Sequence, residues 1–375
     1  MQSANPGPLP PRGDTLGSDF LNLHEFVARA RANLDQNNWD YIVGGAETET
    51  TLKRNRLALD SIALRPRVLR DVSAIDASVE HFGRRLRLPI LLSPIGSLES
   101  FHVHGALSVT RAAEEFGVAH MLSSVCEPGL EALAAAAPDT LRLYQLYVRG
   151  DAAWVDDHVV RAMKHGYAAF CLTVDTAIYS RRERDIAKRH VTVGRRRASG
   201  STFQAALDWR TVARIRKLLH IPLAIKGIGS GEDAKIAVDH GVDWIYVSNH
   251  GGRQLDHGRG SMDVLPEVVD AVAGRAKIIV DGSFCRGTDV VKAIASGADL
   301  VGLGRMQCFA LAAAGQAGIV RMLELLEDEI TRCLGLLGAV KWAEIDRSVL
   351  RPAQPVAPPH VLSAFPLLQI DKYRY

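Results

Sequence analysis

The segment SNHGGRQLD at residues 248–256 holds the side chains best suited to acid–base chemistry. His250 titrates near neutral pH and can serve as a general base. Arg253, three residues later, presents a planar fork that can bind a carboxylate. Asp175 is a candidate partner for the imidazole, whose basicity it would raise. A lone histidine is more often structural, and the chain has 13, but the flanking glycines favour close approach of a ligand.

A second set of residues indicates an anion or cofactor site. Gly282 and Gly304 would let backbone N–H groups approach an anion closely, and Arg305 would add a bidentate donor. The alternative is that these glycines only make turns. Lys226 could form a Schiff base or place a fixed positive charge beside a cofactor ring, and spacing alone does not choose between them.

The elements that must position these residues are short apolar runs alternating with helical stretches. Such alternation predicts βαβ units and a parallel sheet, and eight runs favour a closed (β/α)8 TIM barrel with an N-terminal helical segment. The expected strands cover residues 89–93, 118–123, 142–148, 169–174, 223–226, 244–248, 277–280 and 300–303. The chemical candidates stand at the ends of these runs, where barrels of this kind carry their active sites.

The rest of the chain divides into helices, one basic segment and two terminal pieces. Helical spacing over residues 23–34 and 49–59 is interrupted by paired glycines after Trp39–Val43, and a long helix is expected from Gly304 to about Leu337. The basic segment at residues 180–200 predicts a long loop over the site; its Arg195–Arg197 run is either a polyanion patch or a solvated face. We therefore expect a flexible lead at 1–22, the barrel with its helical segment at 23–350 and a tail at 351–375.

Composition excludes several classes of protein. The charged residues nearly balance, with 45 Lys+Arg against 42 Asp+Glu, which argues against a nucleic-acid binder. No long uninterrupted apolar run predicts a transmembrane helix, and the N-terminus lacks the apolar core of a secretory signal. The five widely spaced cysteines contain no C-x-x-C pair, so we expect no disulfide framework, no metal site and a cytoplasmic location.

The motifs together resemble the FMN-dependent α-hydroxy acid oxidase and dehydrogenase family, which includes glycolate oxidase, lactate oxidase and mandelate dehydrogenase. The resemblance covers roughly residues 23–345, and SNHGGRQLD is its most specific part. Supporting segments are DYIVGGAE and TLKRN near the N-terminus, QLYV at 145–148, LTVD at 172–175, RRERD at 181–185, KG at 226–227, DG at 281–282, RGTDV at 286–290 and GR at 304–305.

The resemblance implies a role for each site residue. His250 would take the hydroxyl or Cα proton while two electrons pass to flavin N5, and Asp175 would orient it. Lys226 would stabilise the anionic reduced ring, which favours the fixed-charge alternative. The substrate would be bound by Tyr41, Tyr147, Arg182, His250 and Arg253, and FMN by Pro94, Ile95, Gly96, Ser123, Gln145, Thr173, Lys226, Ser248, Asp281, Gly282, Ser283, Gly304 and Arg305.

Three departures from the family pattern concern the cofactor and the pocket. Cys285 stands where many members carry a phosphate-binding arginine, so phosphate binding would depend more on Arg305 and the backbone. Val125 replaces a tryptophan of glycolate oxidase, and together with Gly96 it suggests room for an aromatic or longer side chain. The loop between the fourth and fifth strands looks shorter than in many relatives, so it would cover the site less fully.

The expected activity is oxidation of an (S)-2-hydroxy acid to the 2-oxo acid, with electrons passing to O₂ to give H₂O₂. Alternatives are a dehydrogenase using a quinone or another acceptor, an oxidative decarboxylating monooxygenase, and a non-catalytic flavin-binding scaffold or sensor. A scaffold would not need His250, Arg253, Arg182, Tyr41 and Asp175 together. Resemblance alone implies a homo-oligomer, commonly a tetramer.

Overall fold

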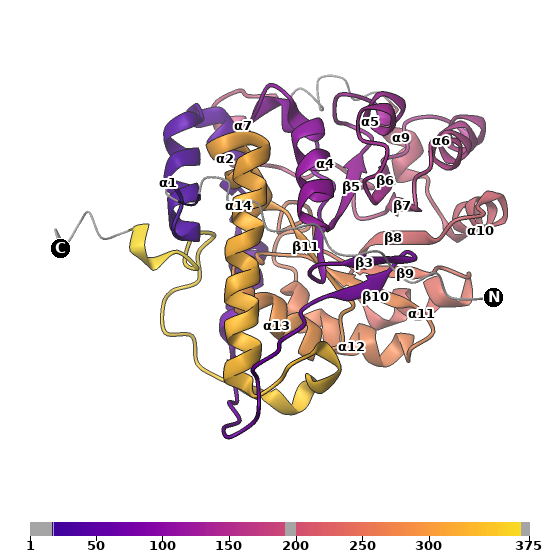
Figure 1. Ribbon diagram of the computed structural model, residues 1–375. Helices are drawn as coiled ribbons and strands as arrows, with labels where there is room; N and C mark the ends of the chain where they lie inside the picture. The colour runs from indigo at the N-terminus through magenta and orange to yellow at the C-terminus, as the bar shows by residue number, and fades with distance from the viewer. Residues whose placement is uncertain (1–16, 18, 192–199, 369–375) are drawn as a thin grey trace.

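Eight parallel strands close into a barrel in the computed structural model, which describes residues 17, 19–191 and 200–368 (Figure 1). The ring closes where Val301 of the last strand pairs with Ile90 of the first. The (β/α)8 prediction is confirmed. The barrel strands are β4 (Ile90–Leu92), β5 (Ala119–Ser123), β6 (Arg142–Leu146), β7 (Ala169–Thr173), β8 (Leu223–Ile228), β9 (Trp244–Val247), β10 (Lys277–Val280) and β11 (Leu300–Leu303).

The barrel interior is a packed core made from alternate residues of the strands. Small side chains such as Ala119, Ala169 and Ala224 leave room for the large rings of Trp244 and Tyr246. The strand residues that face outward pack against the surrounding helices in a second cluster. Because both faces of the strands are buried, the runs are continuously apolar, which made them recognisable in the sequence.

A short hairpin closes the N-terminal end of the barrel. It consists of β2 (Val79–His81) and β3 (Arg84–Leu86), which pair antiparallel. At its turn the Phe82 ring stacks on Trp244 with centroids 4.6 Å apart, while Leu86 joins the interior core. The hairpin was not predicted, because each strand has three residues of mixed polarity. With this end covered, the opposite end carries the site.

Helices cover the outside of the barrel between successive strands (Figure 1). The helical stretches expected between the apolar runs are confirmed. Their observed bounds, with those of the helices not predicted, are α4 (Gly105–Phe116), α5 (Leu130–Ala136), α6 (Ala152–Lys164), α7 (Glu183–Ala187), α9 (Ser201–Ala205), α10 (Trp209–Leu218), α11 (Gly231–Asp239), α12 (Ser261–Val272) and α13 (Gly287–Ala295).

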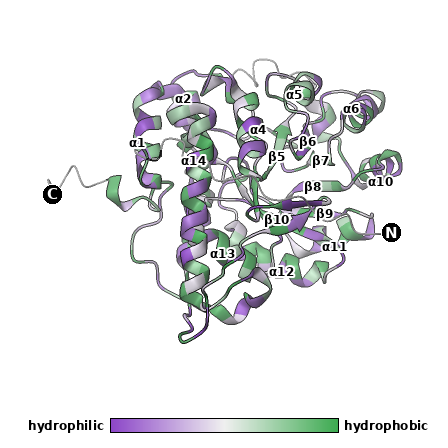
Figure 2. Ribbon diagram, in the orientation of Figure 1, coloured by the Kyte–Doolittle hydropathy of each residue, from purple (hydrophilic) through white to green (hydrophobic). Residues whose placement is uncertain are grey.

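The long helix α14 (Arg305–Leu337) packs beside α1, α4 and α13. Its backbone is kinked at Ala314 and Gly315, and Figure 2 shows hydrophobic and hydrophilic residues mixed along it. By length and composition α14 could cross a membrane, but 67% of its most apolar window is buried inside the protein. That burial is typical of a core helix.

The N-terminal segment folds over the C-terminal mouth of the barrel. It contains α1 (Leu23–Asn33), α2 (Gln36–Val43) and α3 (Thr50–Asp60). The sequence pattern predicted the outer two helices but treated Trp39–Val43 as an interruption; the structure shows that it is helical and that Gly44 ends it. Asp35 caps this helix by accepting a hydrogen bond from Asn38 N–H, which explains how so short an element starts.

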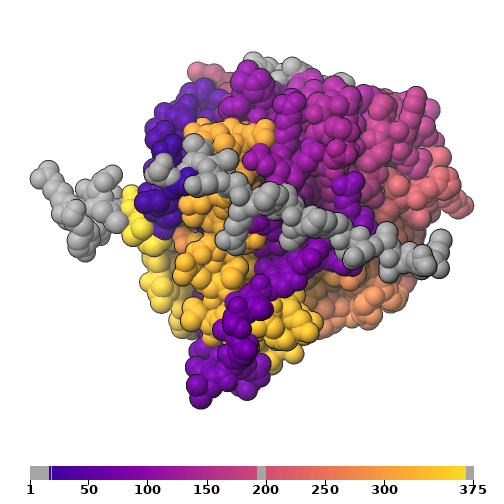
Figure 3. Space-filling view, viewed as in Figure 1, coloured from indigo at the N-terminus to yellow at the C-terminus, as the bar shows by residue number. Residues whose placement is uncertain are grey.

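The C-terminal segment is packed against the barrel over much of its described length. Strand β12 (Leu350–Pro352) pairs antiparallel with β1 (Ile62–Leu64), so the boundary placed at residue 350 falls within a strand. Two short 3₁₀ helices, at Trp342–Glu344 and Arg347–Val349, lead into it. Further on, Phe365 is buried beside Phe309 of α14. Figure 3 shows that the chain between β1 and β3 lies beside α14 on the face in view.

Candidate active site

A cavity of about 770 Å³ opens at the C-terminal ends of the strands, under the N-terminal segment. It combines a few polar groups with a mostly apolar wall, which is the usual character of a small-molecule site. Most of the predicted site residues line it: Tyr41, Pro94, Ile95, Gly96, Tyr147, Arg182, Lys226, His250, Arg253, Asp281, Gly282, Ser283, Gly304 and Arg305.

His250 lies between two hydrogen-bonding partners from different strands. Its Nδ1 is 3.1 Å from Asp175 Oδ1 and 3.2 Å from Oδ2, while its Nε2 is 3.2 Å from the Tyr147 hydroxyl. Because a carboxylate accepts hydrogen bonds, Nδ1 carries the proton and Nε2 keeps its lone pair on the cavity side. The predicted pairing of Asp175 with the imidazole is present, with Asp175 behind the histidine.

The backbone around His250 is unusual in a way that indicates function. His250 has φ = 59°, a left-handed conformation that is strained for a residue with a Cβ. Gly251 follows at φ = 65°, and a Cβ there would lie 2.8 Å from Arg305 Nη1. The glycines of the motif therefore let the loop turn tightly and let the Arg305 guanidinium lie directly against it.

Burial and neighbouring charges set the protonation of this group. Burial lowers the pKa of His250 below its ordinary value; Asp175 counteracts part of that effect, and Lys226 adds to it. For Asp175, burial alone would raise the pKa, but the contacts with His250 and the charge of Lys226 hold it below its usual value. At neutral pH the pair is a neutral imidazole beside a carboxylate, as a general base requires.

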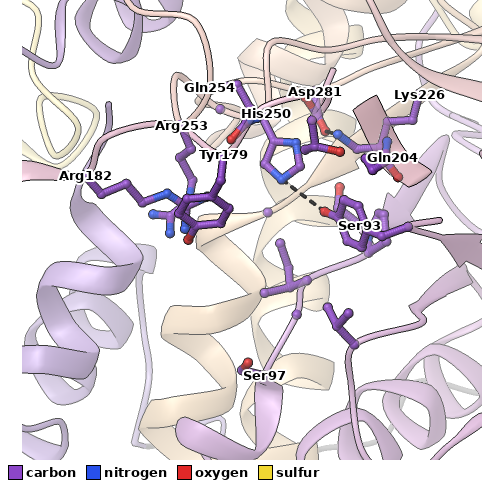
Figure 4. A pocket seen from close by; sticks show the side chains of 18 of the residues that line it. Ser93, Ser97, Tyr179, Arg182, Gln204, Lys226, His250, Arg253, Gln254 and Asp281 are labelled. Atoms are coloured by element: carbon purple, nitrogen blue, oxygen red, sulfur yellow. Dashed lines mark hydrogen bonds and ion pairs between the residues drawn. The ribbon is translucent and has the colours of Figure 1, made fainter. Parts of the chain in front are cut away.

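Two arginines provide the anion-binding part of the cavity. The guanidinium of Arg253 lies 4.5 Å from the centre of the Tyr41 ring, and that of Arg182 lies 4.6 Å from the Tyr179 ring (Figure 4). Arg253 Nη1 donates to the backbone carbonyls of Tyr41 and Gly44. Within the described part of the chain, Arg253 Nη2 and Arg182 Nε are buried and have no hydrogen-bond partner.

Those two unpartnered nitrogens indicate what kind of ligand the pocket can bind. A buried guanidinium N–H without an acceptor is unfavourable, so both are suited to a small anion such as a carboxylate. Burial, followed by the charge of Arg182, lowers the pKa of Arg253 from its usual value. An anion between the two arginines would relieve that repulsion.

Lys226 presents a buried positive charge on the opposite wall. Its Nζ donates to Ser248 Oγ at 2.7 Å and lies 3.3 Å from Asp281 Oδ2. Burial alone would lower the Lys226 pKa, but the carboxylates of Asp281 and Asp175 outweigh it and raise the pKa. An ammonium that stays protonated is a poor nucleophile, so the geometry favours a fixed charge over a Schiff base.

Four predicted cofactor ligands do not line the cavity but are buried near it. These are Ser123, Gln145, Thr173 and Ser248, each no more than 3% exposed. Gln145 Nε2 donates to Thr173 Oγ1 at 2.8 Å, and Gln145 Oε1 has no partner among the described residues. Their contact with a flavin edge remains a prediction.

The ends of β10 and β11 form the predicted phosphate region. Gly282 and Ser283 both have positive φ, and Ser283 Oγ is buried with no partner in the described chain. Arg305 donates to the carbonyls of Ile42, Gly44 and Gly251 at 2.9 to 3.0 Å. Burial, and then the charge of Arg253, lowers the Arg305 pKa to about 9, so this guanidinium would also gain from an anion.

Cys285 lies behind this region and does not line the cavity. Its backbone N–H donates to Asp289 Oδ2 at 3.0 Å, and the same carboxylate forms a buried ion pair with Arg56. Burial raises the pKa of the Cys285 thiol to about 12, so it carries no charge at neutral pH. Arg305 is thus the guanidinium that lines this end of the described cavity.

These features fit FMN. The flavin ring has carbonyl acceptors and a ring N–H donor, which match the Lys226 ammonium and the unpartnered carbonyl oxygen of Gln145. A phosphate matches the unpartnered hydroxyl of Ser283, the nearby glycine backbone and Arg305. The donor set therefore suits an anionic cofactor with a polar ring.

Several residues of the site were not identified from the sequence. Gln254 Nε2 donates to the carbonyls of Asp175 and Ile178 at 3.0 and 3.2 Å, and its place inside SNHGGRQLD could have indicated a role. Tyr179 stands three residues before Arg182, close to a recognised motif. Ser93, Ser97, Phe101, Gln204 and Cys308 also line the cavity, and no motif marks them. The Arg195–Arg197 run lies outside the described residues.

Comparison with known proteins places these features in a family. Residues 30–352 match the model of a family described as FMN-dependent dehydrogenase. An L-lactate oxidase of Nostoc sp. is 37% identical over 359 residues, covering 89% of this chain and 98% of that protein. Glycolate oxidase 1 of Oryza sativa subsp. indica is 37% identical over 352 residues, covering 88% and 95%.

Solved structures show the same similarity in three dimensions. The crystal structure of a mandelate oxidase with (S)-2-phenylpropionate superimposes with a TM-score of 0.83 at 36% identity, covering 90% of this chain and 100% of that one. This chain therefore shares its fold with the mandelate oxidase over most of its length.

Proposed function

The chain belongs to the FMN-dependent dehydrogenase family, and from that membership we propose that it oxidises an (S)-2-hydroxy acid to the 2-oxo acid with FMN as cofactor and O₂ as final electron acceptor. The observation that carries the proposal is a neutral His250 facing the same cavity as two guanidinium groups with unpartnered nitrogens. These groups match the hydroxyl and the carboxylate of a 2-hydroxy acid.

Different side chains bind the substrate and accept its proton. Arg182 and Arg253 bind the substrate carboxylate through charge-assisted hydrogen bonds, and Tyr41 borders the same place. His250 Nε2 accepts the proton that the substrate releases, and the carboxylate of Asp175 stabilises the imidazolium that results. Burial raises the pKa of Tyr147 well above its ordinary value, so its phenol stays protonated and orients the hydroxyl of the substrate.

FMN, when bound, supplies the two-electron acceptor that amino-acid side chains lack. The residues that would hold it stand at the ends of the strands, where Lys226 would place its charge near the ring and Arg305 would bind the phosphate. The N-terminal segment contributes Tyr41 and Ile42 to the cavity wall.

The acceptor can be tested directly. With an FMN-loaded sample and a 2-hydroxy acid, O₂ consumption should match H₂O₂ formation and 2-oxo acid formation one to one. If a quinone or a dye is reduced while O₂ is not consumed, the protein is a dehydrogenase. If CO₂ is released in step with turnover, it is a decarboxylating monooxygenase.

We infer that the substrate carries an apolar side chain larger than a methyl group. Beyond the arginines the cavity wall is built from Phe101, Val125, Ala177, Ile178 and Tyr179. Gly96 lets Val125 pack closely against it within this wall, because a Cβ there would lie 2.7 Å from Val125 Cγ2. Val125→Phe should lower kcat/KM for mandelate or a long-chain acid far more than for lactate; equal losses would refute the assignment.

Two further proposals concern the protein in the cell. We propose a reducing, cytoplasmic location, supported by five cysteines that are all free and buried. We also propose a homo-oligomer; light scattering on the FMN-loaded protein would test it, and a mass near the 40.8 kDa of one chain would contradict it.

A further inference from the structure

Gln204 is a buried polar residue of the cavity to which no role has yet been given. It lies on α9, the short helix Ser201–Ala205, and is 7% exposed. Its side chain lines the cavity together with Lys226 and Asp281 (Figure 4). A buried amide must have both its donor and its acceptor satisfied, so its partners show what it does.

The Gln204 amide joins two neighbouring strands at the point where they separate. Its Oε1 accepts a hydrogen bond from the Val148 N–H at 2.7 Å, and its Nε2 donates to the Thr173 carbonyl at 2.8 Å. The backbone pairing of β6 with β7 ends just before, at Leu146 and Leu172. The side chain therefore continues the strand-to-strand connection with the same kinds of donor and acceptor that the backbone uses.

Both residues that contact His250 are close to this connection in sequence. Tyr147 directly precedes Val148, and Asp175 follows Thr173 by two residues. We propose that Gln204 is a positioning residue that holds Tyr147 and Asp175 in place on the two ring nitrogens of His250. The inference rests on the proposed function, in which His250 is the base.

His250 is a sensitive reporter of this arrangement because charged and titratable groups face it from several elements. These are Tyr147 after β6, Asp175 after β7, Lys226 on β8 and Arg182 before α7. Of these, Asp175 raises the His250 pKa, whereas Lys226 and Arg182 lower it. If Asp175 is held less firmly, the pKa of His250 must fall further.

Gln204→Met tests the inference, because methionine has similar length and no amide. In the FMN-loaded protein we expect kcat to fall about tenfold or more, since small misplacements of reacting groups are costly. KM should change little, because Arg182 and Arg253 are untouched. The acid limb of the kcat/KM profile and the His250 pKa, followed by NMR on histidine-labelled protein, should both move to lower pH.

Two further variants separate positioning from folding. Phe203→Ala changes an exposed neighbour on the same helix, outside the cavity lining, and should leave kcat and the His250 pKa unchanged. Gln204→Glu keeps an acceptor for the Val148 N–H but loses the donor to the Thr173 carbonyl. It should therefore still reduce kcat.

The inference is overturned if Gln204→Met has the wild-type kcat and His250 pKa, or if its kcat falls only in proportion to lost FMN with the pKa unmoved. Failure of the proposed function is a separate result: the wild-type protein would then turn over no 2-hydroxy acid. The NMR titration does not depend on turnover, so it would still report whether Gln204 positions Asp175.

Discussion

Asp175 and His250 come from strands that are not neighbours, yet the carboxylate meets the imidazole Nδ1 at 3.1 Å. Strand β8 lies between them, and it leaves room because its residue at that level is Gly227. A Cβ on Gly227 would lie 2.6 Å from Asp175 Cβ, and the glycine has φ = 108°. The contact that makes His250 a base is therefore built by three strand ends together.

Removing the charge of Asp175 should change both the rate and its pH dependence. A protonated His250 cannot accept a proton, so kcat/KM of the wild-type protein should fall as the pH drops through a pKa below 6.5. Because Asp175 raises that pKa, Asp175→Asn should move the acid limb to still lower pH. The plateau should drop about 10²-fold or more, since the imidazolium loses its partner. Rate profiles from pH 4 to 9 would check this; a limb displaced toward higher pH would contradict the assigned interaction.

Replacing Arg253 by lysine should weaken substrate binding although the positive charge is kept. Lysine cannot present the planar fork, so the unpartnered Nη2 is lost as a donor. A lost hydrogen bond to a charged group corresponds to about 10- to 100-fold in kcat/KM, expressed mainly as a higher KM. Arg181→Lys is the matched control, because Arg181 is exposed and paired with Glu183 at 3.1 Å. Equal effects of the two variants would show that Arg253 has no special part in binding.

Arg305 should discriminate between FMN and riboflavin, which differ by the phosphate. Arg305→Leu removes the guanidinium at this end of the cavity, so the FMN affinity should fall about 10- to 100-fold. The affinity for riboflavin should change much less. Quenching of flavin fluorescence during titration of apoprotein measures both constants. A parallel loss for the two flavins would show that Arg305 mainly supports the N-terminal segment through its bonds to Ile42 and Gly44.

The sequence predicted two kinds of feature: strands whose residues are buried on both faces, and a loop whose residues carry chemistry. The strands β4 to β11 were recognisable because both their faces are buried, and SNHGGRQLD because a charged, glycine-rich loop at a strand end has few structural uses. Most of the predicted site residues meet in one cavity, and the pairing of Asp175 with His250 is present.

Other features depend on contacts between segments distant in sequence. The hairpin β2–β3 is held by the stacking of Phe82 on Trp244, 162 residues away by number, which no local pattern reveals. Trp39–Val43 is helical because Asp35 caps it and Trp39 packs against Phe309. Gln204 acquires its function from Val148 and Thr173, and nothing in its neighbourhood in the sequence marks it.

The reductive half-reaction with and without the base tests the central claim most directly. FMN-loaded wild-type protein and His250→Gln are each mixed anaerobically with an (S)-2-hydroxy acid such as mandelate, and the visible flavin band is followed. The account predicts rapid bleaching of the wild-type protein and bleaching slowed about 10²- to 10⁴-fold in the variant, with equal FMN content in both. Bleaching at the same rate in both proteins would contradict the assignment of His250 as the base, and bleaching of neither by any 2-hydroxy acid would contradict the proposed reaction itself.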